Sequence, residues 1–206
     1  MIGPEQAPTR AAVLELRQER SVVSEAYDFL DEKRLLLAAE LLRQLDAYQQ
    51  LQAKLESLVG QARRQLIAAV ARHGVQGLSV YPAAPLEGAR LHRQQRNFMA
   101  VTLVETQLRF TESQQSAPRL ASNPSSEAEA CRKVFADMIR HSAELAGLSG
   151  NLHRLLAEYR LTERRARALE NVILPEIEQS LNEMNSYLEE VDLEDAIRAR
   201  LHRHAL

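Results

Sequence analysis

The stretch from Thr9 to Arg72 contains no proline and a single glycine, Gly60. Leu, Ala, Arg, Gln and Glu dominate it, and all five are strong helix formers. Thr9 is a candidate N-cap, and Gly74 and Gly77 are candidates for the helix stop. At ~1.5 Å per residue, such a helix is on the order of 95 Å long. A helix of that length does not fit inside one compact domain of a 206-residue chain.

A seven-residue repeat indicates what covers this helix. With position a at Val13 and position d at Leu16, thirteen of the seventeen a and d positions up to Ala69 are apolar or tyrosine. Heptads sustained over this length are typical of a coiled coil, because an isolated amphipathic helix drifts off a strict repeat. The remaining four positions are polar and would fix the register at a cost in stability: Arg20, Arg34, Gln44 and Gln65.

A second helical region is predicted from about Ser126 to His202, beginning with a capping box that ends at Glu129. Its apolar stripe runs with a spacing of three and four to Ile173 and then shifts to Ile177. Pro175 lies at the shift and predicts a bend, because proline removes one helical hydrogen bond. A further break or bend is expected near 147–150, where two glycines occur.

The middle of the chain has a different character. Glycines and prolines from Gly74 to Gly88 interrupt any helix. Two short strands are expected, at Leu78–Tyr81 and within Asn97–Phe110, where β-branched and aromatic residues are frequent. Ser113 to Asn123 has the composition of a flexible connector.

The sequence therefore predicts an all-α dominated fold, a long antiparallel two-helix coiled coil with a small irregular or β-hairpin insertion in the middle. The expected parts are an N-terminal coiled-coil helix over 1–73, an insertion over 74–124, and a C-terminal helical region over 125–206 with bends near 147–150 and at 175.

Composition and motifs exclude several classes of function. A net charge of −2 and 4% aromatic residues argue against nucleic-acid binding. Cys131 is the one cysteine, which fits a reducing compartment, and neither a signal peptide nor a membrane span is expected. No phosphate loop, zinc signature or dinucleotide turn is present, so no catalytic residue, cofactor or metal is predicted. Nine acidic residues between Ala168 and Ile197 are interpreted as a solvated or partner-facing strip.

Residues 161–178 carry a more specific pattern: threonine, paired arginines, an Ala-Leu-Glu triplet and a proline at fixed offsets. This pattern, followed by further acids, resembles the C-terminal helix of the D subunit of the V-type and archaeal-type rotary ATPases. The resemblance covers roughly 8–60 and 150–200. The residues that carry it, and that are candidates for interfaces, are Thr9, Arg10, Lys33, Arg34, Thr162, Arg164, Arg165, Leu169, Glu170, Pro175, Glu189 and Glu190.

The chain departs from the family pattern at a few positions. Ala166-Arg167 stands where the family usually has Val-Asn, Ala26 stands for a usual glycine, and Asp31 stands for a usual lysine. These departures indicate a diverged member.

The resemblance implies a mechanical role. In this family the D subunit is the axle of the central stalk, and its termini enter the bore of the ring of alternating catalytic and regulatory head subunits. Its other end meets the small F subunit of the stalk and the funnel-shaped subunit on the membrane rotor ring. Carried over, residues 10–30 and 180–206 would lie in the bore and residues 60–145 would face the stalk partners. The implied location is cytoplasmic, peripheral to the membrane, without direct membrane insertion.

Three alternatives stay open at this point. A cytoplasmic coiled-coil scaffold or regulatory protein shares the heptads but does not explain the offsets between the arginines and Pro175. The gamma axle of an F-type ATP synthase has paired helices too, but it has a larger α/β middle than the 51 residues of 74–124. A hydrolase using Cys131 or the carboxylates has no motif behind it.

Overall fold

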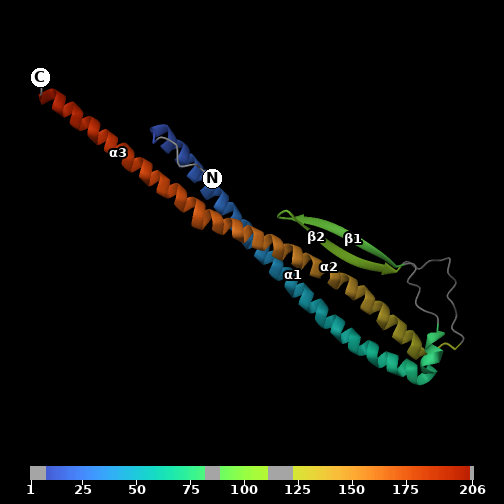
Figure 1. The fold of residues 1–206 in the computed structure, drawn as a ribbon. Coiled ribbons are helices and arrows are strands. Elements are labelled where there is room, and N and C mark those ends of the chain that lie inside the picture. Colours follow the sequence, from blue (N-terminus) through green and yellow to red (C-terminus); the bar gives the residue numbers. More distant parts are fainter. Residues whose placement is uncertain (1–7, 82–88, 111–122, 205–206) are drawn as a thin grey trace. The chain divides into compact units, whose positions relative to one another are not determined.

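A computed structural model describes residues 8–81, 89–110 and 123–204 (Figure 1). It confirms the predicted fold class, two long antiparallel helical segments with a small β-hairpin between them. The elements in chain order are α1 (Arg10–Ser79), β1 (Ala89–Phe98), β2 (Val101–Phe110), α2 (Ser126–Ala168), the π-helix η2 (Leu169–Ile173) and α3 (Leu174–His204).

The predicted heptad positions of α1 form its buried side. Sixteen of the seventeen a and d positions from Val13 to Ala69 are buried or half-buried, and Arg20 is the exception. The chain divides into two compact units, residues 1–36 with 159–206, and residues 37–158, which are described in turn.

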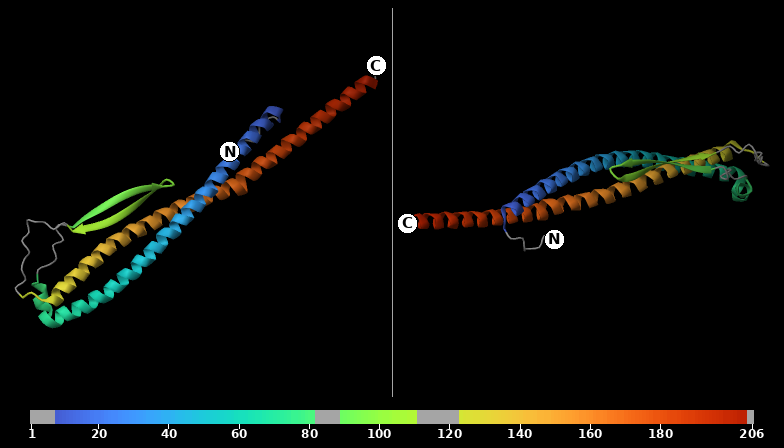
Figure 2. Two further views of the ribbon diagram at one scale, coloured as in Figure 1. Left: turned by 180° about the vertical axis from the view of Figure 1, so that it is seen from behind. Right: turned by 90° about the horizontal axis from the view of Figure 1, so that it is seen from above.

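The first unit is built on an apolar cluster between the start of α1 and α3. Its buried members are Val13, Leu16, Ile177 and Leu181, with Val23, Met184 and Leu188 packed against them. Two exposed ion pairs flank this cluster. Arg10 Nη2 lies 3.0 Å from Asp192 Oδ2, and Arg20 Nη2 lies 2.8 Å from Glu178 Oε1. Arg20, the later residue in α1, pairs with the earlier residue in α3, so these two helix segments are antiparallel (Figure 2).

The π-helix adjusts the buried stripe of the C-terminal segment. In η2 the Leu174 N–H donates to the carbonyl of Leu169, five residues back, and the wider turn takes up one extra residue. Thr162 and Ile177 are both buried and 15 residues apart, one more than two heptads. The stripe predicted through Ile173 is therefore not kept: Ile173 is 36% exposed. Pro175 follows directly as the second residue of α3 and cannot donate a helical hydrogen bond there. The bend expected at this residue stays a prediction.

In the second unit, the end of α1 is joined to the start of α2. Gly74 has a left-handed backbone, with φ of 70°, and helical residues continue beyond it to Ser79. His73 Nε2 lies 2.6 Å from the hydroxyl of Ser125. That hydroxyl also accepts a hydrogen bond from the Ala128 N–H, so Ser125 is the N-cap of α2, one residue before the predicted cap.

The hairpin turns at Met99 and Ala100, which have φ of 46° and 68°. Two consecutive left-handed residues close a tight two-residue hairpin turn, a geometry that usually selects Asn and Gly. The strand predicted at Leu78–Tyr81 is wrong, because its first two residues complete α1. The second predicted strand is correct over 101–110, but residues 97 and 98 belong to β1. The predicted connector lies outside the described residues except for Asn123.

Candidate interaction surfaces

The described residues contain no group of three or more His, Cys, Asp or Glu side chains arranged to hold a metal ion. Cys131 is buried, and burial raises the pKa of its thiol, which keeps the sulfur protonated and unreactive. His141 Nδ1 lies 3.3 Å from the Glu144 carboxylate. Within the described part of the chain, no helix is long and apolar enough to cross a membrane.

The N-terminal motif residues lie at the start of α1 and within its first half. Thr9 Oγ1 accepts a hydrogen bond of 3.2 Å from the Ala12 N–H and caps the helix. Arg10 binds Asp192 of α3 with both carboxylate oxygens at 3.0 Å. Lys33 and Arg34 are half-buried, and Arg34 Nη2 lies 2.6 Å from Asp31 Oδ1.

The motif residues of α2 differ sharply in exposure. Thr162 is 1% exposed and is part of the buried seam. Arg164 and Arg165 point to solvent, and Arg164 Nε reaches back to the carbonyl of Arg160 at 3.3 Å. The two arginines therefore present their guanidinium groups to solvent, while the threonine packs inside the buried seam.

The motif continues through the π-helix into α3. Leu169 is half-buried and Glu170 is exposed. Glu170 lies close enough to the Tyr27 hydroxyl of α1 to raise the pKa of that phenol, because the neighbouring carboxylate disfavours a phenolate. Pro175, the second residue of α3, is exposed.

The acidic strip lies along η2 and α3. All nine of its carboxylates, including those of Glu189 and Glu190, are on exposed residues. Asp192 lies beside the first residue of α1, so residues 193–204 extend past the start of that helix (Figure 2). This extension also exposes a stripe of apolar side chains at a spacing of four: Leu193, Ile197 and Leu201.

A second candidate surface is the hairpin, which polar contacts fix to α2. The Asn151 side chain, 1% exposed, accepts from the Val104 N–H at 2.8 Å. Its amide donates to the Val104 carbonyl at 3.1 Å. One side chain thus satisfies both peptide groups of a strand residue, as a neighbouring strand would.

A close approach reinforces this contact. Thr106 Oγ1 donates to the Ala143 carbonyl at 2.6 Å. A Cβ atom at Gly147 would lie 3.2 Å from Thr106 Cβ and Cγ2 and would overlap Thr106 Oγ1. The helix α2 continues through Gly147 and Gly150 without a break, and Gly147 provides room for β2. The bend expected near 147–150 stays a prediction.

A buried carboxylate of α1 anchors the hairpin near its turn. Glu40 Oε1 accepts from Arg43, Gln44 and Arg96 at 2.6–2.9 Å, and Arg96 belongs to β1. The hydrogen bonds from Arg43 outweigh the effect of burial and lower the pKa of Glu40 to about 2. The carboxylate is therefore ionised at any physiological pH.

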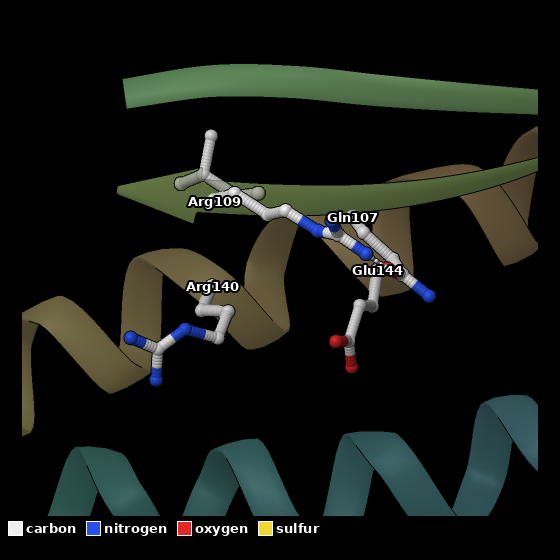
Figure 3. A pocket seen from close by; sticks show the side chains of 5 residues that line it. Gln107, Arg109, Arg140 and Glu144 are labelled. Carbon is white, nitrogen blue, oxygen red and sulfur yellow. Dashed lines mark hydrogen bonds between the residues drawn. The ribbon is translucent and has the colours of Figure 1, made fainter. Parts of the chain in front are cut away.

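An open pocket of about 410 Å³ lies between β2 and α2 (Figure 3). Gln107 and Arg109 reach it from β2, and Arg140 and Glu144 from α2. Arg109 donates to Gln107, and Glu144 contacts His141, so its charged side chains already have partners in the protein.

Sequence reasoning missed the residues that hold the hairpin. Asn151, Thr106 and Glu40 act through individual polar contacts rather than a repeating apolar pattern, so they leave no periodic signal in the sequence. The one available signal was Gly147 within a helical pattern, which indicates a close backbone approach as well as a break.

Comparison with known proteins places these surfaces in context. The family model described as the D subunit of ATP synthase matches residues 12–203. The V-type ATP synthase D subunit of Anaeromyxobacter dehalogenans is 31% identical over 210 residues, covering 96% of this chain and 95% of the relative. The V-type D subunit of Thermotoga neapolitana is 26% identical, covering 94% and 95%. The A-type D subunit of Thermococcus sibiricus is 24% identical, covering 94% and 91%.

Proposed function

Because this chain belongs to the family of ATP synthase D subunits, we propose that it is the non-catalytic rotor axle in the central stalk of a V/A-type ATPase. In this role it couples ATP hydrolysis or synthesis in the head to rotation of the membrane ring, and so to transport of protons or sodium ions. The observation that carries the proposal is the family match over residues 12–203, on a chain whose described part is built of paired helices.

The surface of the first unit supports a mechanical role. An axle drives its head by contacting each catalytic interface differently in each orientation, and only a difference in contact energy shifts an equilibrium. The surface of the unit is asymmetric, because its two helices carry different side chains. Its α3 carries the exposed acidic strip and the apolar stripe of Leu193, Ile197 and Leu201, whereas the start of α1 carries Arg10 and Arg20.

The ends of the helical pair are assigned to the head. Residues 10–30 and 180–206 enter the bore between catalytic and regulatory subunits, with Glu189 and Glu190 among the contacts. The motif residues around Arg164, Arg165 and Glu170 contribute to the interfaces at the mouth of this region. Their exposure leaves these side chains available for a partner.

The middle of the chain is assigned to the stalk. Residues 60–145 face the small F subunit of the stalk and the funnel-shaped subunit on the rotor ring. The protein works in the cytoplasm and is peripheral to the membrane, since its attachment runs through these partners. It carries no active site of its own, takes no cofactor and binds no nucleic acid.

Purification of the tagged chain from its native cell tests the proposal. We expect an ATPase head with about one copy of this chain per three catalytic subunits, since a single axle occupies the axis of a ring. A self-associated chain with unrelated partners would instead support the alternative, a cytoplasmic coiled-coil scaffold.

A charge reversal tests the assigned contacts. Glu189→Lys with Glu190→Lys is expected to lower the ions moved per ATP hydrolysed, because both carboxylates are exposed on the acidic strip. Glu56→Lys on the exposed side of α1 is the matched control and is expected to leave coupling unchanged. Equal coupling in all three proteins would remove these acids from the head interface.

A further inference from the structure

The two edges of the β-hairpin differ in what covers them. The edge of β2 is covered by α2, with Asn151 bound to the main chain of Val104 and Thr106 bound to Ala143. The edge of β1 has no such cover: its residues from Arg90 to Asn97 are all exposed. Among the described residues, no backbone hydrogen bond links β1 to an element other than β2.

The strand pairing identifies which peptide groups face outward. Val104 gives its N–H and carbonyl to Asn151, so it does not exchange hydrogen bonds with Gln95, the residue opposite it. Bonded and non-bonded pairs alternate along an antiparallel ladder. The outward N–H and carbonyl groups of β1 therefore belong to Leu91, Arg93, Gln95 and Asn97.

The charge of β1 selects the kind of partner. The strand contains Arg90, His92, Arg93 and Arg96 and no acidic residue, although the whole chain has a net charge of −2. Two copies paired through this edge would bring arginines together, which opposes self-association. An acidic strand would meet complementary charge along the same edge.

The hairpin is also fixed in position before any partner binds. The contacts of Glu40 with Arg96, and of Asn151 with Val104, fix it to both long helices of its unit. Little order is lost when a second strand is added to an edge that is already fixed. Strand addition then supplies main-chain hydrogen bonds for affinity and side-chain contacts for selection.

From these observations we infer that the outer edge of β1 binds an extended, acidic segment of a partner protein, which adds a third strand to the hairpin. Arg90 and Arg93 contact its carboxylates, and the outward peptide groups from Leu91 to Asn97 pair with its backbone. The inference rests on the proposed function in one respect: the partner protein is expected to belong to the ATPase complex.

A peptide titration of the isolated full-length chain tests the binding chemistry. Arg90 and Arg93 lie three residues apart in β1 and so face opposite sides of the hairpin. The probe is therefore an eight-residue peptide of repeated Glu-Glu-Val-Val, which carries carboxylates on both faces of a strand, and its control is repeated Lys-Lys-Val-Val. Only the Glu peptide is expected to slow amide exchange at Leu91, Arg93, Gln95 and Asn97, by about tenfold or more. Equal protection by the Lys peptide, equal protection by a single-stranded oligonucleotide, or none at all would overturn the inference.

Variants separate charge from backbone pairing. Arg90→Glu with Arg93→Glu is expected to weaken Glu-peptide binding at least about tenfold. The control Arg63→Glu with Arg64→Glu, on the exposed side of α1, should leave it unchanged. Gln95→Pro removes one outward N–H and spares the ladder to β2, so it should weaken binding in a hairpin that stays folded. Unchanged affinity in both β1 variants would contradict strand addition.

Hydrogen exchange in the purified ATPase complex tests whether the edge is used. The outward amides of β1 are expected to become protected there, while the inward amides stay protected in both states. Recovery of the complex with rapidly exchanging outward amides would leave the rotor assignment intact and reject an occupied edge.

Discussion

The paired helices and the hairpin are stabilised by different physics. In the first unit, Val13, Leu16, Ile177 and Leu181 bury apolar surface along a repeating stripe. The hairpin depends on individual polar contacts at Asn151, Thr106 and Glu40, and on the missing side chain of Gly147. The apolar stabilisation of the helix pair is shared among many residues and depends little on the exact position of any one of them. The hairpin contacts depend on the positions of individual atoms. The two regions should therefore respond differently to substitution.

The largest effect is expected in the apolar cluster. Ile177 is 3% exposed, so Ile177→Ala removes buried surface and leaves a cavity, at a cost of about 3 kcal/mol in the free energy of unfolding. Ile173→Ala is the control, since Ile173 is 36% exposed and should lose less than about 1 kcal/mol. Urea unfolding measures both. Equal losses would contradict the shift of the stripe at the π-helix.

Next in size is the close approach of the hairpin to α2. Gly147→Ala forces Thr106 away and breaks its hydrogen bond to Ala143, which should cost about 2 kcal/mol. At Gly150 an added Cβ would meet only the Arg154 guanidinium, at 3.5 Å or more. Gly150→Ala should therefore stabilise the helix by about 0.5–1 kcal/mol. Thermal unfolding of the two variants should show shifts of opposite sign, and shifts of the same sign would contradict the packing.

The anchor at Glu40 should make stability depend on pH. Its pKa is lowered to about 2 in the folded chain, against an ordinary value of 4.5. The ionised form therefore adds stability above pH 4.5, and this is lost as pH falls through about 2. Glu40→Gln should cost about 1.5 kcal/mol at pH 7 and much less near pH 2. Urea unfolding across this range provides the measurement; a pH-independent difference would remove the carboxylate from the anchor.

The smallest effect is expected at the hairpin turn. Ala100 has φ of 68°, which strains a residue with a Cβ, so Ala100→Gly should stabilise the protein by about 1 kcal/mol. Ala39→Gly, on the exposed side of α1, is the matched control and should destabilise it by about 1 kcal/mol. Differential scanning calorimetry distinguishes the two. A loss of stability in both variants would contradict the turn geometry.

What could be predicted from the sequence follows the same division. The repeat from Val13 to Ala69 identified the buried side of α1, because periodic burial leaves a periodic pattern. The turn at Met99-Ala100 was missed because it lacks the Asn-Gly signal that usually marks a two-residue hairpin turn. The strand β1 was missed since its polar residues do not alternate.

The candidate site was predictable in part. The motif from Thr162 to Pro175 indicated the family, and the family match extends over residues 12–203. The structure separates the motif into a packing residue, Thr162, and outward arginines, a distinction that the pattern alone did not make. The predicted shift of the apolar stripe from Ile173 to Ile177 falls directly after the π-helix Leu169–Ile173, and Ile177 is buried. The sequence pattern indicated the shift but not the wider helical turn that produces it.

Direct observation of rotation tests the central claim. Cys131→Ala leaves Arg63→Cys, on the exposed side of α1, as the one cysteine of the chain, and a bead is attached there with the ATPase head fixed to a surface. We expect ATP to make the bead turn continuously in one direction and removal of ATP to stop it. A bead that stays fixed relative to a head still hydrolysing ATP would contradict the assignment of this chain as the rotor axle.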